Sequence, residues 1–235
     1  MTKRIMAIFF VTLLLFGIFW ISGCNNESLD DYQKKGKEAI DVYVSNIDQS
    51  NYSTEEWDNI LSIATYGKQS IESATNKTEV DMEIQKTEEA IDLGYYEVEI
   101  NDMIELHTWH FTSGVPNNAI VVKYAAHNAI IECVVDNGQF GFSADAPKSL
   151  TVEPEEVFYW QPNEKVEKAF VNIRIKIDEN IVGYAIVKIE QKSQSVEYMA
   201  SVLRSAVFPK INGNFQNITT LQVDNIINEI TEENL

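Results

Sequence analysis

The sequence offers few side chains whose types and spacing could support metal binding. Its three histidines are His107, His110 and His127, and the first two have a spacing that occurs in metal sites. In a β-strand, side chains three residues apart point to opposite faces. A zinc site would therefore need His127 and a carboxylate to converge with one of the other two. We expect ordinary surface histidines and no bound metal.

Motifs for catalysis are also missing from the sequence. It contains no G-x-S-x-G, no phosphate-binding P-loop, no His-Glu-x-x-His and no glycine-rich dinucleotide motif. Carboxylates such as Glu153, Glu155 and Glu156 have no marked apolar pocket around them, so a glycosidase pair would have to come from loops that the sequence does not identify. We predict a non-enzymatic protein without catalytic residues or a cofactor; a hydrolase of unrecognised type is the alternative.

Cys24 has the clearest chemical role in the sequence. It follows two basic residues and an apolar stretch of roughly 17 residues, the lower limit for a membrane-spanning helix. The segment Ile21-Ser22-Gly23-Cys24 resembles a bacterial lipobox, in which small residues precede the cleavage site. We predict that residues 1–23 are a lipoprotein signal peptide and that a covalent diacylglycerol on Cys24 anchors the chain to the membrane. A retained membrane helix and a plain secretory signal are the alternatives.

Charge and cysteine content fit an exported protein. Cys133 has apolar neighbours and no partner once Cys24 is lipidated, so we expect a buried thiol and no disulfide. Loss of residues 1–23 removes two of 18 basic and none of 36 acidic residues, which changes the net charge from −18 to −20. Such acidity argues against nucleic acid as a partner. We expect a location on the outer face of the cytoplasmic membrane of a Gram-positive type of bacterium.

A helical period extends from Leu29 to Leu93, where apolar residues recur at steps of three and four. Ser53 and Glu56 form a capping box at the start of the second segment, and Gly94 is a typical residue after a helix end. The pattern predicts three helices of about 15 to 20 residues. We expect a lipidated tether at residues 24–30 and a three-helix bundle at residues 31–94.

The second and third of these helices share a set of residues with a known module: Tyr52, Ser53, Trp57, Ala74, Thr75, Val80, Asp81, Ala90, Ile91 and Leu93. With these residues the segment resembles the FIVAR-type three-helix module of Gram-positive surface proteins. Such modules are spacers or accessory binding units in wall-associated enzymes and adhesins. The resemblance implies a cell-surface location and a stalk next to the anchor, and it implies no ligand.

After Gly94 the sequence alternates apolar and polar residues, which predicts seven or more short strands. Asn137-Gly138 and residues 178–180 predict two hairpins, and residues 196–208 are interpreted as a strand. Thr219 and Gln222 predict the cap of a final helix. We therefore expect a two-domain α+β fold, in which residues 95–235 form an immunoglobulin-like antiparallel β-sandwich with a short C-terminal helix.

Aromatic residues are the best candidates for ligand binding. Trp109 and Phe111 lie in one aromatic segment and Tyr159 and Trp160 in another. Such side chains stack on a sugar or a peptide when they face water, whereas core packing is the alternative. The sequence thus favours a lipid-anchored surface protein whose β-sandwich binds a protein or carbohydrate ligand on a helical stalk. The alternative is a structural or accessory subunit of an envelope complex.

Overall fold

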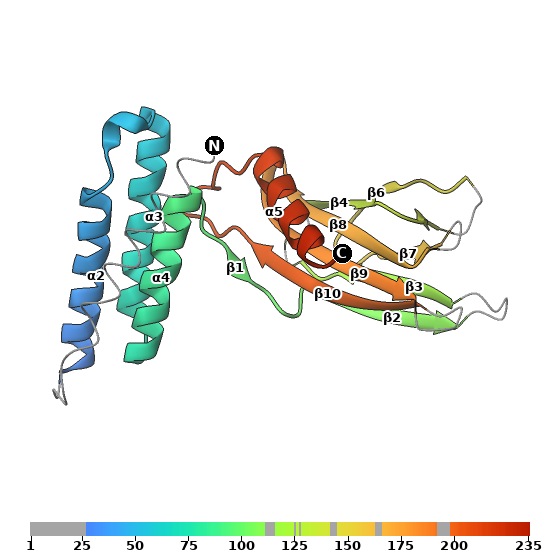
Figure 1. Ribbon diagram of the computed structural model, residues 1–235, viewed down its shortest axis with the longest axis horizontal. Helices are drawn as coiled ribbons and strands as arrows, with labels where there is room; N and C mark the ends of the chain where they lie inside the picture. Colours follow the sequence, from blue (N-terminus) through green and yellow to red (C-terminus); the bar gives the residue numbers. More distant parts are fainter. Residues whose placement is uncertain are drawn as a thin grey trace.

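The computed structural model describes residues 27–110, 116–124, 126, 128–141, 145–162, 166–191 and 198–235, with the backbone alone at 108–110 and 116–118. Its class is α+β, as predicted: helices precede and follow antiparallel sheets (Figure 1). The expected signal peptide and Cys24 lie outside the described residues. Within the described part, no helix combines the length and apolarity needed to cross a membrane.

Up to Gly94, the described residues form three α-helices, which we call the helical module: α2 (Leu29–Ser45), α3 (Thr54–Ser73) and α4 (Lys77–Leu93). A short 3₁₀ helix, η1 (Gln49–Asn51), lies between the first two. The predicted capping box at Ser53 and Glu56 is confirmed, and Gly94 has the left-handed φ of 78° that favours glycine. These ends are set by side chains within one turn of the helix.

Two tyrosine–aspartate pairs show that α2 and α4 run parallel. The Tyr32 hydroxyl donates to Asp81 Oδ1 at 2.8 Å near the start of both helices, and the Tyr43 hydroxyl donates to Asp92 Oδ1 at 2.7 Å near their ends. The helices enclose an apolar core. Its buried members from the helices are Ile40, Ile60, Ile63, Ala64, Ile71, Val80, Ala90 and Ile91.

Among the described residues, ten strands form two antiparallel sheets. The six-stranded sheet has the order β1-β10-β9-β8-β4-β6, and the four-stranded sheet has the order β2-β3-β7-β5. We call the two sheets and the final helix the β module. The strands are β1 (Val98–Glu99), β2 (Ile104–His110), β3 (Pro116–Val122), β4 (Ala129–Val135), β5 (Gln139–Phe140), β6 (Ser149–Val152), β7 (Val157–Gln161), β8 (Lys168–Ile177), β9 (Asn180–Gln191) and β10 (Tyr198–Val207).

The strand order corrects two predictions. Immunoglobulin constant domains have one sheet of strands A, B, E and D and one of C, F and G, whereas here the consecutive strands β8, β9 and β10 lie side by side in one sheet. The hairpin expected at Asn137-Gly138 is also wrong, because β4 pairs with β6 and β8 while β5 pairs with β7 in the other sheet. This turn instead carries the chain between sheets.

Other local predictions in the β module are confirmed. Asp178 and Glu179 form a two-residue turn between β8 and β9, with Ile177 paired to Asn180 and a φ of 54° at Asp178. The ambiguous segment at 196–208 contains strand β10. The final helix α5 (Thr220–Glu233) begins at Thr219, which forms the predicted capping box with Gln222.

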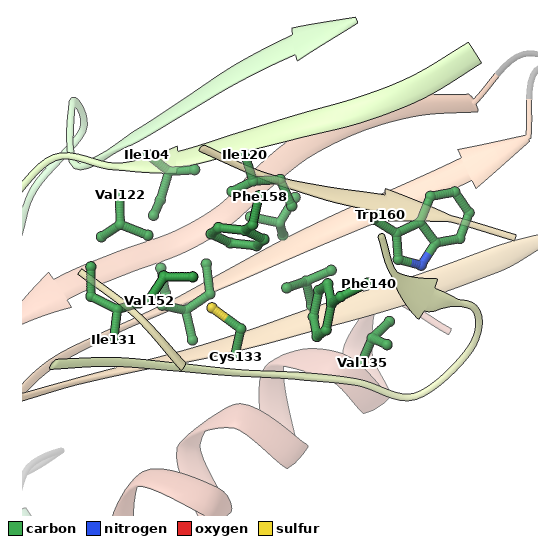
Figure 2. Close-up of a cluster of buried hydrophobic side chains, with 14 of the residues drawn as sticks. Ile104, Ile120, Val122, Ile131, Cys133, Val135, Phe140, Val152, Phe158 and Trp160 are labelled. Carbon is green, nitrogen blue, oxygen red and sulfur yellow. The ribbon is translucent and has the colours of Figure 1, made fainter. Parts of the chain in front are cut away.

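Apolar side chains from both sheets share one core (Figure 2). Ile120 and Phe158 come from the four-stranded sheet, and Ile131, Cys133 and Val152 come from the six-stranded sheet. A second cluster lies where α5 covers the outer face of β8 and β9, with Val223 and Ile227 against Phe170 and Tyr184. Strand β9 is therefore covered on both faces, by the shared core and by α5, and almost all of its residues are buried.

Candidate functional site

Trp160, one of the predicted ligand-binding residues, belongs to the core. Its side chain has 0 % exposure, and its Nε1–H donates to the Asn137 carbonyl at 2.8 Å. The indole also packs edge-on against Tyr198, with ring centroids 5.0 Å apart. The prediction that Trp160 contacts a ligand is therefore corrected: the alternation of β7 turns this side chain inward together with Phe158 (Figure 2).

The structure describes only some of the other candidate side chains. Tyr159 is half-buried on the opposite face of β7, whereas the Trp109 side chain and Phe111 lie outside the described residues and stay predictions. His107 is exposed and its Nε2 lies 2.8 Å from Glu105 Oε1, while the His110 side chain and His127 also lie outside the description. The described residues contain no group of three or more His, Cys, Asp or Glu side chains that could hold a metal.

Cys133 is a free and fully buried thiol, as predicted. Burial raises its pKa to about 12, so the nucleophilic thiolate is scarce at neutral pH.

A polar cluster lies at one edge of the six-stranded sheet. β10 has a bulge between Val202 and Arg204, and a bulge re-aims the side chains that follow it. The Arg204 guanidinium forms an ion pair with Glu97, and its Nε lies 3.4 Å from Glu99 Oε1. β1 places these two carboxylates here because it pairs with β10 at Val98–Val207 and Glu99–Ala206.

A buried tyrosine helps to fix the position of the Glu97 carboxylate. The Tyr184 hydroxyl donates to Glu97 Oε2 at 3.1 Å, and the Tyr184 side chain is fully buried. Desolvation raises the pKa of Glu97 even though the Arg204 charge and the bond from Tyr184 lower it. Desolvation and the Glu97 charge likewise raise the pKa of Tyr95 to about 12 and raise that of Tyr184. Glu97 is thus held by its partners, while Glu99 is largely exposed.

A small open pocket of about 170 Å³ lies beside this cluster. It is smaller than the sites of drug-sized ligands, which are about 300–1,000 Å³, so it fits one side chain or a small group. Two carboxylates, Glu97 and Glu99, outnumber the single guanidinium of Arg204, and this balance favours a cation. The pocket is lined by Glu99, Asn101, Val202, Leu203, Arg204 and Ser205.

The polar groups in this lining can contact a ligand through charge and hydrogen bonds. The one hydroxyl in its lining, that of Ser205, donates to the Ile100 carbonyl. The pocket lining has no histidine or cysteine to act as a base or nucleophile. Sequence reasoning missed this site because Glu97 and Arg204 are 107 residues apart. The available signals were two glutamates alternating in "YYEVEI" and one arginine in the apolar segment "SVLRSA".

Comparison of the chain with models of protein families, with curated proteins and with solved structures finds no match.

Proposed function

We propose that this chain is a lipid-anchored, non-enzymatic protein of the bacterial cell surface. In this proposal the helical module is a three-helix, FIVAR-like stalk, and the β module is a two-sheet sandwich that binds a protein ligand. The signal peptide, the diacylglycerol on Cys24 and the location outside the cytoplasmic membrane are parts of the same proposal.

The observation that carries the proposal is the direction of the helices. Because α2 and α4 run parallel, α2 begins at the end of the helical module opposite to Gly94, where the chain leaves for β1 (Figure 1). A helix of 17 residues such as α2 is about 25 Å long at 1.5 Å per residue. An anchor just before α2 would thus keep the β module one helix length from the bilayer.

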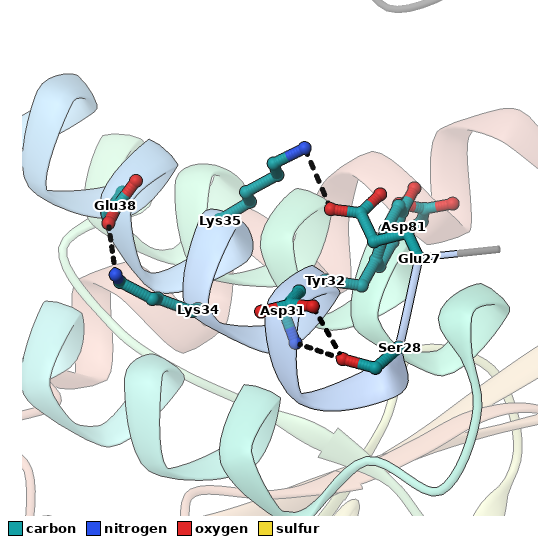
Figure 3. Close-up of polar contacts among 8 residues, drawn as sticks. All are labelled: Glu27, Ser28, Asp31, Tyr32, Lys34, Lys35, Glu38 and Asp81. Carbon is teal, nitrogen blue, oxygen red and sulfur yellow. Dashed lines mark hydrogen bonds and ion pairs between the residues drawn. The ribbon is translucent and has the colours of Figure 1, made fainter. Parts of the chain in front are cut away.

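Side-chain bonds hold the start of α2 in place (Figure 3). Ser28 caps the helix, accepting the Asp31 N–H at 3.1 Å, and Lys35 pairs with Glu27 at 2.7 Å. Glu27 is three residues after Cys24, and three residues span at most about 10 Å. A lipid on Cys24 would therefore place the helix start at the membrane surface.

The junction between the modules combines apolar packing with buried hydrogen bonds, which supports a stalk that fixes the direction of the β module. Tyr95 packs in the apolar cluster beneath α5, and the next residue, Tyr96, packs in the core of the helical module. The buried Gln216 side chain accepts the Tyr96 N–H at 2.7 Å and donates to the Tyr96 carbonyl at 2.8 Å. Ile211 also packs in the helical core.

Of the two candidate aromatic side chains that the structure describes, Trp160 is fully buried and Tyr159 half-buried, which favours a protein ligand over a sugar stacked on β7. Two measurements distinguish a protein ligand from a carbohydrate ligand: affinity capture of proteins from detergent-solubilised membranes, and binding of the chain to glycan arrays. We expect a captured protein that the glycans do not compete away. Retention on a glycan without a captured protein would contradict it, and a stable stoichiometric complex would indicate an accessory subunit instead.

The anchor is tested by the substitution Cys24→Ala, with cell fractionation as the measurement. We expect most of the variant to lose the lipid-dependent, detergent-extractable membrane association, because the acyl chains supply the binding energy. Cys133→Ala is the control, since it removes the other cysteine and leaves the lipobox intact. The same lipid-dependent membrane association in Cys24→Ala as in the wild type would overturn the lipid-anchor proposal.

A further inference from the structure

Strand β10 is covered along only part of its outer edge. It has ten residues, whereas β1 has two, which pair with Val207 and Ala206. One more bond joins the Ile100 N–H to the Ser205 carbonyl at 2.9 Å. In the part of the chain that the structure describes, no strand pairs with this edge from Tyr198 to Arg204. Among the described residues, the backbone of this segment therefore has no strand partner on its outer side.

The first six residues of this segment lack two common protections of edge strands, charge and proline, whereas the bulge and Arg204 come only at its end. Proteins protect edges with charged residues, with proline or by keeping the strand very short. β5 has two residues, β6 has four, and β2 carries Glu105 and His107. In contrast, the six residues from Tyr198 to Leu203 contain neither charge nor proline.

The side chains at this edge also remain partly uncovered. Met199 is 50 % exposed. Ala200 and Val202 pack against the core but are only partly buried, unlike the fully buried Val187 and Ile189 on the neighbouring strand. An added strand would cover this apolar rim, which is the favourable term in association.

We propose that the open edge of β10 takes up an extended segment of a partner protein as an additional strand, with a lysine or arginine side chain in the pocket beside Glu99. This inference rests on the proposed protein-binding function and names the partner's chemistry. In strand addition, backbone hydrogen bonds give affinity and side-chain pockets give specificity.

The charges around the pocket suit a basic side chain. Arg204 lines the pocket but is paired with Glu97, which does not line it, so the Glu99 carboxylate is left to receive a cationic end. The Glu99 side chain is 65 % exposed, and its ion pair with Arg204 is as long as 3.4 Å. The acidic body of the chain, with a net charge of −18, attracts a basic partner and repels a second copy.

The test uses the full chain in detergent micelles and a capped seven-residue peptide of alternating valine and threonine with a lysine at each end. Hydrogen exchange measured by mass spectrometry reads the backbone amides directly. We expect the peptide to slow exchange in the segment from Tyr198 to Arg204 and to leave α2, α3 and α4 unchanged. The same peptide with glutamate ends should bind at least about tenfold more weakly.

A matched pair of charge reversals isolates the pocket. Glu99→Lys should lower the affinity for the lysine peptide at least about tenfold and raise the affinity for the glutamate peptide. Glu38→Lys changes the net charge equally at an exposed site on α2 and should leave both affinities unchanged.

Each contrary outcome has a definite meaning. Unchanged exchange from Tyr198 to Arg204 with every peptide overturns strand addition, and equal binding of both peptides overturns the basic preference. Concentration-dependent dimers with protection of that segment in the absence of peptide would show that a second copy is the occupant, which also overturns the proposal. If membranes still yield a captured protein while the peptides fail, the strand-addition inference fails and the proposed function stands.

Discussion

At the scale of single residues, Gly67 sets how closely α3 and α4 approach. A Cβ added at this position would lie 2.1 Å from Thr87 Oγ1, far inside van der Waals contact. Thr87 is fully buried, and its hydroxyl donates to the Glu83 carbonyl at 2.6 Å. The threonine cannot turn away without losing this bond, so the close contact of the two helices depends on glycine.

Gly67→Ala should therefore destabilise the protein by roughly 1–3 kcal/mol, the usual cost of overpacking, even though alanine is the better helix former. Urea denaturation measures the change. Gln69→Ala, two residues away at an exposed site of the same helix, is the control and should change stability by less than about 0.5 kcal/mol. An unchanged midpoint for Gly67→Ala would show that the helices can separate at no cost.

At the scale of elements, α4 carries acidic residues at both ends, and the two ends have opposite effects. Glu79 in the first turn accepts the Thr75 N–H at 2.6 Å, and this bond lowers its pKa. Near the last turn, desolvation raises the pKa of Glu88, and the Asp92 and Glu89 charges raise it further. A helix favours negative charge at its N-terminus and disfavours it at its C-terminus.

The sign of each pKa shift predicts the effect of neutralisation. Ionised Glu88 is disfavoured in the folded state, so its stability cost appears as pH rises through the folded pKa. Glu88→Gln should raise stability at pH 7 by about 0.2–0.5 kcal/mol, the cost of a like-charge pair four residues apart, and should have no effect near about pH 3. Thermal unfolding at both pH values measures the difference.

Glu79→Gln, on the same helix, is the matched comparison for Glu88→Gln. The pKa of Glu79 is lowered, so its stabilisation is present above the unfolded pKa and is lost as pH falls through the folded one. This variant should be less stable than the wild type at pH 7, and the difference should shrink on acidification. Two variants that shift stability in the same direction at pH 7 would contradict this account of α4.

At the scale of the whole molecule, Gln216 joins the two modules. Its amide oxygen accepts the Tyr96 N–H. Its amide nitrogen donates to the Tyr96 carbonyl and to the Pro209 carbonyl, the latter at 2.9 Å. Gln216→Ala leaves these buried groups without their partner, at about 1–3 kcal/mol for each unsatisfied group. We expect a loss of at least about 2 kcal/mol in urea denaturation and faster amide exchange at Tyr96.

The neighbouring Asn217 provides the control for this junction. Its amide donates to Glu55 at 3.2 Å in an exposed bond between the same two modules. Asn217→Ala should cost less than about 0.5 kcal/mol, because water replaces an exposed partner. Equal effects of the two substitutions would show that Gln216 has no special part in joining the modules.

The strand arrangement could be predicted only in part. Asn137-Gly138 correctly marks a turn, and Gly138 has a φ of 87°. However, two strands on either side of a turn have the same alternating residue pattern whether they pair with each other or enter different sheets. The inward direction of Trp160 and the meeting of Glu97 with Arg204 likewise depend on partners far along the chain.

By itself, the sequence determined the helix caps, Gly94, the Asp178 turn and the terminal helix, because these features depend on side chains within a few residues of one another. Only the tertiary structure decided which strands are neighbours, that Trp160 is core, and that no described strand pairs with β10 from Tyr198 to Arg204, beside a pocket. Those features arise from contacts between segments that are far apart in the sequence. The local pattern of apolar and polar residues shows which face of a strand is buried, but it does not determine which distant segment packs against that face.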